Sequence, residues 1–262
     1  MDLGIKGKLA LVTGSTAGIG NAIAASLARE GARVIISGRK QKGVDAAVAK
    51  LKAEGGDVLG FAGDLTDANT AEALAKAHPG VEILVNSLGI FEPKAFEDIP
   101  DEDWRRFFEV NVLSGVRLSR LYLPAMKRAN WGRIIFISSE SGVQIPAEMI
   151  HYGMTKSAQI AVARGLAEEV AGTGITVNSV LPGPTSSRGV GEFVDALAKA
   201  EGMTLETFEK NFFEKVRPTS LIKRFARPEE VAAMVTYVAS SLASATTGAA
   251  LRVDGGVVKS AF

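Results

Sequence analysis

Short apolar runs alternate along the chain with longer amphipathic stretches, and this alternation restricts the folds that the chain can adopt. The runs are nearly continuous in valine, isoleucine and leucine, which is typical of strands buried on both faces of a sheet. Strands that alternate with helices predict an α/β doubly wound fold, with a parallel sheet and helices on both of its faces. The predicted strands are 8–13, 33–38, 57–63, 82–87, 133–138, 175–181 and 249–254, and the predicted helices include 21–30, 43–54, 101–129, 152–171 and 228–241.

The length of the chain, 262 residues, fits either one large α/β domain or two small ones. The predicted strands follow one another without a linker rich in proline, glycine or serine. We therefore expect residues 1–262 to form a single domain with a seven-stranded parallel sheet. The segment from about 185 to 226 departs from this pattern, because it replaces a short connection and has helical patterning of its own. Insertions of this kind are often lids over a functional site.

Composition and charge exclude several classes of function. The chain has no cysteine, which excludes disulfides, cysteine-based zinc sites and thiolate nucleophiles. Its two histidines, His78 and His151, lie far apart without metal-ligand spacing, so no metal site is expected. A formal net charge of +1 gives no reason to expect binding to nucleic acid or to a membrane. Residues 1–14 show neither a signal-peptide pattern nor an apolar run of bilayer length, so a cytoplasmic protein is expected.

A glycine-rich turn, TGSTAGIG at 13–20, joins the first predicted strand to the first predicted helix. Glycine suits such a turn because the turn is tight and because the backbone must approach a pyrophosphate on the helix N-terminus. The alternative is that the glycines only shape the turn, but the strand and helix signals on both sides favour dinucleotide binding. The candidate binding residues in this turn are Gly14, Ser15, Thr16, Gly18, Ile19 and Gly20.

The end of the second predicted strand, ISGRK at 36–40, bears on which dinucleotide binds. An acidic residue there accepts hydrogen bonds from a ribose 2′-hydroxyl and favours NAD, but this chain has Gly38 followed by Arg39. A guanidinium binds a 2′-phosphate through paired hydrogen bonds, and Ser37 offers a further donor. The pattern predicts NADP(H) in preference to NAD(H). The alternative is that Arg39 is a solvated residue at the start of the next helix.

Three polar residues near the fifth predicted strand suit the reduction of a carbonyl. Tyr152 and Lys156 share one face of a predicted helix, and Ser139 precedes Tyr152 by thirteen residues. Hydride transfer to a carbonyl leaves an alkoxide that must be protonated, and a tyrosine whose pKa is lowered by a nearby ammonium is a suitable acid. Ser139 can donate a hydrogen bond to the carbonyl oxygen as charge develops on it. A lone Y-x-x-x-K pair is usually two helix-surface residues, but its register with the strand and the glycine turn argues against that alternative.

These motifs together resemble those of the short-chain dehydrogenase/reductase family, in its shorter, non-extended branch. The resemblance rests on the TGxxxGxG spacing at 13–20 and on the Ser…Tyr-x-x-x-Lys order of Ser139, Tyr152 and Lys156, and it covers essentially the whole chain. It implies a Rossmann-type fold, an NAD(P)-dependent oxidoreductase, and a homotetramer or homodimer. It also implies that Lys156 holds the cofactor ribose while it supports Tyr152.

The same resemblance assigns roles to residues that follow the third and fourth predicted strands. Asp64 would hydrogen-bond the adenine amino group, with Leu65 beside it, whereas Asp67 is predicted to cap a helix. The family's usual NNAG appears here as NSLG, which keeps Asn86 and Gly89. Gly89 is interpreted as a close backbone approach to the cofactor, and Asn86 as mainly structural.

Asn111 and the segment after the sixth predicted strand provide the remaining candidate site residues. Asparagine is unfavourable inside a helix, so Asn111 indicates a local break or a water-holding role. In the family the matching asparagine joins a proton relay behind the lysine; the alternative is a kink or a satisfied core amide. Pro182 and Gly183 would turn the backbone toward the nicotinamide, and Thr185, which replaces a usual aliphatic residue, could touch the amide or a phosphate. His151 is interpreted as a bystander or a pocket wall, since adjacent helical residues point about 100° apart.

The expected function is an NADP(H)-dependent oxidoreductase that interconverts a ketone and a secondary alcohol, such as a 3-oxoacyl reductase or a related small-molecule dehydrogenase. The alternatives are an epimerase or dehydratase that keeps its cofactor bound, or a non-catalytic nucleotide sensor. Aromatic and aliphatic residues of the insertion can either line an apolar roof or anchor its helices in the core. The residues that can face the substrate are Glu140, Gln144, Ile145 and Met149, and the roof candidates are Phe193, Leu197, Phe208, Phe212 and Phe213.

Overall fold

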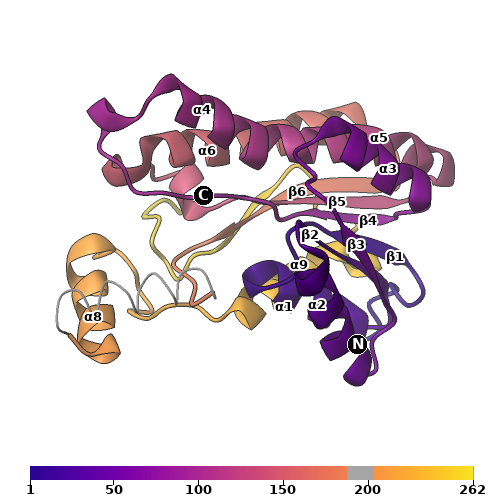
Figure 1. Ribbon diagram of the computed structural model, residues 1–262, viewed down its shortest axis with the longest axis horizontal. Coiled ribbons are helices and arrows are strands. Elements are labelled where there is room, and N and C mark those ends of the chain that lie inside the picture. Colours follow the sequence, from indigo (N-terminus) through magenta and orange to yellow (C-terminus); the bar gives the residue numbers. More distant parts are fainter. Residues whose placement is uncertain (188–202, 262) are drawn as a thin grey trace.

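A seven-stranded parallel sheet forms the centre of the computed structural model, which describes residues 1–187 and 203–261 (Figure 1). The spatial order of the strands is β3-β2-β1-β4-β5-β6-β7, and every pairing is parallel. This architecture confirms the predicted doubly wound fold. The strands are β1 (Leu9–Val12), β2 (Arg33–Gly38), β3 (Val58–Ala62), β4 (Ile83–Asn86), β5 (Gly132–Ile137), β6 (Ile175–Pro182) and β7 (Ala250–Val253).

Helices cover both faces of the sheet (Figure 1). On one face lie α1 (Gly18–Arg29), α2 (Gln41–Ala53) and α9 (Pro228–Ala239). On the other lie α3 (Ala68–Ala77), α4 (Asp101–Phe108), α5 (Ser114–Ala129) and α6 (Ile150–Glu169). Helix α8 (Leu205–Asn211) stands apart from both layers. No helix among the described residues is long and apolar enough to cross a membrane.

Alternate residues of the central strands supply two separate hydrophobic cores. Val34 and Ile36 of β2 belong to the core beneath α1 and α9, whereas Ile35 between them belongs to the core beneath α5 and α6. Val85 and Leu84 of β4 divide in the same way. Successive side chains of a strand point to opposite faces, so a sheet covered on both faces requires apolar residues at every position. This requirement explains the continuous valine, isoleucine and leucine runs of the sequence.

The helical stretch before β5 is interrupted at the position of Asn111. Residues Glu109–Leu113 form a π-helical turn between α4 and α5, and Asn111 is completely buried in it. Such turns inside α-helices often occur at functional sites. The local break predicted from the asparagine is confirmed. The expected cap of α3 is confirmed as well, because the Asp67 carboxylate accepts a hydrogen bond from the Thr70 N–H at 2.8 Å.

The order of the strands brings distant segments together at one edge of the sheet. Strand β1 lies between β2 and β4. The connection that follows β1 leads to β2 on one side of it, and the connection that follows β3 leads to β4 on the other side. Ligands of open α/β sheets bind in the crevice that forms at such a switch point. The glycine-rich turn follows β1, and the segments that contain Gly89, Ser139 and Gly183 follow β4, β5 and β6 at the same edge.

Candidate active site

A cavity of about 610 Å³ opens at this edge of the sheet. Its lining comes from the segments that follow β1, β4, β5 and β6, from the start of α6, and from part of the insertion. The predicted site residues that line it are Gly14, Gly18, Ile19, Gly20, Gly89, Ser139, Tyr152, Lys156, Pro182, Gly183 and Thr185. The predicted site residues outside its lining are Ser15, Thr16, Arg39, Asp64, Leu65, Asn86 and Asn111.

In the glycine-rich turn, two stretches of backbone lie so close together that a residue larger than glycine would not fit. Gly14 and Gly18 have φ angles of 62° and 59°, in the left-handed region that favours glycine. A Cβ atom at Gly20 would lie 2.6 Å from the carbonyl oxygen of Gly14. Helix α1 begins without a side-chain cap, with Ala17 at its N-cap. Its first N–H groups are therefore left to an outside partner, and a dinucleotide diphosphate fits this cradle.

Three side chains near the turn point inward instead of toward a ligand. Ser15 is buried, and its hydroxyl donates to the carbonyl oxygen of Val12 at 2.7 Å. Ser37, expected to donate to a 2′-phosphate, also donates to Val12 O, at 3.3 Å, and is buried in the strand. The methyl group of Thr16 fills the space above Gly38, where an added Cβ would lie 2.5 Å from it. An aspartate of the NAD-binding kind at position 38 would therefore require Thr16 to move.

The residues expected at the adenosine end lie at the surface or in the core. Arg39 is exposed directly after β2, and within residues 1–187 and 203–261 no carboxylate forms an ion pair with it. Asp64 is exposed, and its Oδ1 accepts hydrogen bonds from the N–H and the hydroxyl of Thr66 at 3.0 and 2.7 Å. Leu65 is buried in the core, so only its backbone can meet a cofactor.

Asn86 is the last residue of β4, and Gly89 lies in the loop that follows it. Asn86 is buried, and its Nδ2 donates to the hydroxyl of Ser119 at 3.3 Å, in agreement with the structural role expected for it. A Cβ atom at Gly89 would lie 3.5 Å from Lys156 Nζ, so this backbone borders the lysine directly. The loop is held by Thr13, whose hydroxyl accepts two backbone N–H groups at 2.8 and 3.0 Å. This role of Thr13 was not predicted from the sequence.

Ser139, Tyr152 and Lys156 lie around the same end of the cavity. Ser139 follows β5, Tyr152 lies in the first turn of α6, and Lys156 lies one turn later. The Lys156 ammonium is 5.5 Å from the centroid of the Tyr152 ring and donates to the carbonyl oxygen of Ile137 at 2.9 Å. The neighbouring Ser138 donates to the carbonyl oxygen of Lys156 at 2.8 Å. Ser138 also lines the cavity, but its hydroxyl is committed to the backbone of α6, whereas the Ser139 hydroxyl makes no such contact with the helix.

The pKa of Tyr152 differs from the value expected from the sequence. Burial and the negative charge of Glu140 raise the pKa of Tyr152, and the smaller effects of Ser139 and Arg217 in the opposite direction do not compensate. Burial also lowers the pKa of Lys156 to about 7. The expected lowering of the Tyr152 pKa by Lys156 is therefore not found in this structure. At neutral pH Tyr152 is a phenol, which is the form that donates a proton.

A buried glutamine connects Lys156 to the π-helical turn. Gln159 accepts a hydrogen bond from Lys156 Nζ at 3.0 Å and donates from Nε2 to the carbonyl oxygen of Asn111 at 2.6 Å. The side chain of Asn111 accepts from the N–H of Ile90 at 2.8 Å and donates to the hydroxyl of Thr155 at 2.9 Å. Asn111 therefore supports the lysine through its backbone, and Gln159 is the residue that carries this support. Gln159 could not be identified from the sequence, because a glutamine three residues after the lysine belongs to none of the motifs that indicate the site.

His151 lies in an aromatic cluster outside the lining of the cavity. Its ring is completely buried, 4.1 Å from the centroid of Phe107 and 6.0 Å from that of Trp104. Neither of its nitrogens has a hydrogen-bond partner among the described residues, and burial lowers its pKa. This placement agrees with the bystander interpretation, and His151 is not part of the pocket wall.

The residues expected at the substrate end divide into two groups. Glu140 and Met149 line the cavity, whereas Gln144 and Ile145 are exposed outside it. Of the roof candidates, Phe208 and Phe212 line the cavity, and Phe213 is buried between Phe212 and Phe225. Phe208 and Phe212 therefore fit the interpretation as roof residues, and Phe213 fits the interpretation as a core anchor. Phe193 and Leu197 lie outside the described residues.

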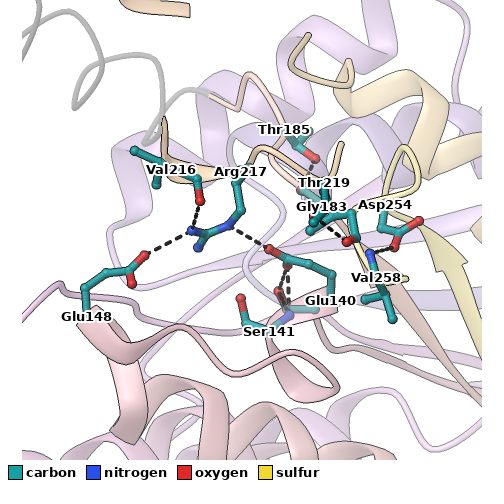
Figure 2. Close-up of polar contacts among 12 residues, drawn as sticks. Glu140, Ser141, Glu148, Gly183, Thr185, Val216, Arg217, Thr219, Asp254 and Val258 are labelled. Carbon is teal, nitrogen blue, oxygen red and sulfur yellow. Dashed lines mark hydrogen bonds and ion pairs between the residues drawn. The ribbon is translucent and has the colours of Figure 1, made fainter. Parts of the chain in front are cut away.

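An arginine of the insertion, Arg217, lines the cavity, and its side chain lies between Glu140 and Glu148 (Figure 2). Arg217 lies 3.5 Å from Glu140 between Nε and Oε1, and its Nη1 donates to Glu148 Oε1 at 3.0 Å. The three side chains come from the end of β5, from the turn before α6 and from the segment after α8. Neither Arg217 nor Glu148 was identified from the sequence, where no spacing connects them to the serine and the tyrosine.

Comparison with known proteins identifies the family. Residues 8–197 match the model of the short chain dehydrogenases. The chain belongs to the short-chain dehydrogenase/reductase family. The oxidoreductase YvaG of Bacillus subtilis, itself described as uncharacterized, is 49% identical over 264 residues, which cover 100% of each chain. The D-beta-hydroxybutyrate dehydrogenase of Cupriavidus necator is 35% identical over 260 residues, 97% of this chain and 99% of that protein.

A solved structure of the same family has almost the same fold. The L-sorbose reductase of Gluconobacter frateurii, in complex with NADPH and L-sorbose, has a TM-score of 0.94 and 33% identity, and covers 99% of this chain and 100% of that one. The protein is thus a short-chain dehydrogenase/reductase with the Rossmann-like fold of its relatives, and it is an oxidoreductase. The sorbose reductase structure contains NADPH, which supports the use of NAD(P) by the present protein.

Proposed function

We propose that the protein is an NADP(H)-dependent oxidoreductase that interconverts a ketone and a secondary alcohol. The observation that carries the proposal is a single cavity that joins the glycine-rich turn at one end to Ser139, Tyr152 and Lys156 at the other. A dinucleotide needs the first set of groups and a reacting carbonyl needs the second. The NADPH-bound sorbose reductase, which also contains the ketose L-sorbose, supports the same reaction class.

The residues of the cavity fit the parts of NADP. The uncapped start of α1 would hold the diphosphate, and Gly89, Pro182 and Gly183 would border the nicotinamide half. Arg39 would bind the 2′-phosphate, since its guanidinium is exposed beside the end of β2 and forms no ion pair in the described part of the chain. When bound, the nicotinamide supplies or accepts the hydride.

The protein's own groups would handle the proton and the developing charge. Tyr152, a phenol at neutral pH, would donate its proton to the alkoxide oxygen during reduction. Ser139 would donate a hydrogen bond to the same oxygen. Lys156, when charged, would stabilise the phenolate that remains and bind a ribose hydroxyl. Part of the predicted lid forms one side of the cavity through Phe208, Phe212 and Arg217, and we retain a lid role for it within a single domain. The homotetramer implied by the family stays a prediction.

The direct test is a panel of ketones and secondary alcohols assayed with both NADP(H) and NAD(H), followed by the absorbance of the reduced nicotinamide. We expect net oxidation of NADPH with at least one class of ketone, at a higher kcat/KM than with NADH. Cofactor consumption by none of the compounds, together with tight NADPH binding, would instead indicate a nucleotide sensor or a non-redox enzyme of the same family.

Replacement of Gln159 by leucine should shift the pH dependence of reduction. The change removes one of the two acceptors of Lys156 Nζ and leaves the carbonyl oxygen of Ile137, so the charged form of a lysine whose pKa is about 7 loses support. The pKa falls further, and activity that requires the ammonium is lost at lower pH. Because a hydrogen bond to a charged group contributes about 1.5–3 kcal/mol, we expect the alkaline limb of kcat/KM to move down by about one pH unit or more.

Gln159→Glu is the matched control, since its carboxylate has nearly the same shape and should raise the pKa of Lys156. The alkaline limb should then move to higher pH. Profiles of kcat/KM for both variants and the wild type, recorded between about pH 5 and pH 10, check the signs. Two variants that lose activity equally at every pH would show that Gln159 only maintains the fold.

A further inference from the structure

Glu140 is a buried carboxylate at the reacting end of the cavity, and the chemistry proposed above does not use it. Its side chain is 7% exposed and lines the cavity beside Ser139. Its Oε2 accepts a hydrogen bond from the Ser139 hydroxyl at 2.5 Å and from the Ser141 N–H at 2.9 Å. An ionised carboxylate can only accept hydrogen bonds, so Ser139 is the donor of this pair.

This contact conflicts with the role proposed for Ser139. A serine hydroxyl has a single hydrogen, and here it is directed to Glu140. Ser139 can therefore donate to a substrate carbonyl without a loss at Glu140 only if another donor takes its place there. If the Ser139 hydrogen turned away, Glu140 would keep the Ser141 N–H and the Arg217 guanidinium but lose one hydrogen bond, and lost hydrogen bonds of a buried carboxylate are unfavourable.

The surroundings of Glu140 fix the carboxylate in place. The guanidinium of Arg217 lies 3.5 Å from Oε1, on the side opposite Ser141 (Figure 2). Arg217 is held in turn by Glu148 Oε1 and by the carbonyl oxygen of Val216, each at 3.0 Å from Nη1. Glu140 thus cannot turn away from Ser139 without losing its ion pair, and the replacement donor has to arrive with the substrate.

The charges of Glu140, Glu148 and Arg217 also limit which substrates the cavity can bind. Arg217 faces two carboxylates, so the three side chains together carry a net charge of −1. A substrate carboxylate would add a second negative charge next to Glu140. Several of the remaining lining residues are apolar, among them Phe91, Met149 and Phe212. The site therefore suits a neutral molecule with an apolar part and a hydrogen-bond donor close to the reacting carbon.

We propose that the substrate is a neutral carbonyl compound with a hydroxyl group on the carbon next to the carbonyl. This hydroxyl donates to Glu140 and replaces Ser139 there. The hydrogen of Ser139 then turns to the carbonyl oxygen, so the hydroxyl both binds the substrate and releases the serine for its role. The inference rests on the proposed ketone reduction and specifies its substrate class.

Three matched ketones test the proposal: 2-hydroxyacetophenone, acetophenone and phenylglyoxylate. They share a phenyl ketone and differ only in a hydroxymethyl, a methyl or a carboxylate group beside the carbonyl. We expect kcat/KM of the wild type with NADPH to be highest for 2-hydroxyacetophenone and lowest for phenylglyoxylate. Discrimination by a site built to bind a hydroxyl is commonly about 100-fold or larger.

Glu140→Leu separates recognition by the protein from the intrinsic reactivity of the ketones. The ratio of kcat/KM for 2-hydroxyacetophenone to that for acetophenone should fall by about ten-fold or more in this variant, because intrinsic reactivity cancels when ratios are compared. Glu140→Gln, which keeps the size of the side chain, should lower the ratio in the same direction if the leucine variant does not fold. The exposed Glu72 on α3 provides the control Glu72→Leu, whose ratio should equal that of the wild type.

The outcomes separate this inference from the proposed function. A ratio unchanged in both Glu140 variants, or a wild type that prefers phenylglyoxylate, would overturn the hydroxyl-recognition proposal while ketone reduction stands. Failure of the wild type to reduce any of these ketones and any member of the wider panel would overturn the proposed function and this inference together.

Discussion

Tyr152→Phe is expected to lower kcat for ketone reduction by about 1000-fold, since general acid catalysis by a positioned side chain contributes about 100- to 10,000-fold. The substitution removes only the hydroxyl oxygen, and the phenyl ring keeps its edge contact with Phe91, whose centroid lies 6.4 Å away. The Tyr152 hydroxyl has a side-chain hydrogen bond with Ser139, which lines the same cavity and does not belong to the hydrophobic cores. The loss should therefore fall on the proton transfer and not on folding.

Cofactor binding provides the control for this variant. The dissociation constant of NADPH, measured by titration of nicotinamide fluorescence, should stay within about three-fold of the wild-type value, because the diphosphate and 2′-phosphate contacts are unchanged. The melting temperature of the variant should also remain close to that of the wild type. A kcat near the wild-type value would remove Tyr152 from the proposed mechanism, whichever substrate is used.

Arg39→Asp should reverse or strongly reduce the preference for NADPH over NADH. The substitution removes the guanidinium proposed to bind the 2′-phosphate and places a negative charge near it. It also supplies an acid that can accept hydrogen bonds from a ribose 2′-hydroxyl. Because one charge-assisted contact contributes about 1.5–3 kcal/mol and repulsion adds to its loss, the ratio of kcat/KM for the two cofactors should fall by about 100-fold or more.

The matched control is Arg128→Asp, which makes the same charge reversal at an exposed position of α5 outside the cavity lining. Its cofactor ratio should equal that of the wild type at the same ionic strength. Gly38→Asp is a further comparison, since the methyl group of Thr16 lies 2.5 Å from the position of an added Cβ. An Arg39→Asp ratio equal to that of the control would show that Arg39 does not select the cofactor.

Features that depend on local backbone requirements could be predicted from the sequence. The strands were found because a parallel sheet covered on both faces needs apolar side chains at successive positions, as Val34, Ile35 and Ile36 show. The break around Asn111 was found because an asparagine side chain is unfavourable in a regular helix. The glycine positions were found because Gly14 and Gly18 adopt backbone angles that other residues rarely adopt.

Contacts between distant elements could not be predicted in the same way. Gln159 contacts the backbone of Asn111 across 48 residues of chain, and Arg217 contacts Glu148 across 69. Neither pair follows a helical or strand period, so no pattern in the sequence connects them. The inward direction of Ser37 was missed for a related reason, since a serine at the end of a strand can face either a ligand or the neighbouring turn.

The order of the secondary structure, the glycine-rich turn and the candidate set of Ser139, Tyr152 and Lys156 follow from the sequence alone. The partner that receives the hydrogen of Ser139, and the raised pKa of Tyr152, follow from the packed fold. The two groups of features differ because backbone angles and hydrophobic periods are set by neighbouring residues. Desolvation and charge proximity, in contrast, depend on which distant side chains the fold packs together, here Glu140 and Arg217 around the tyrosine.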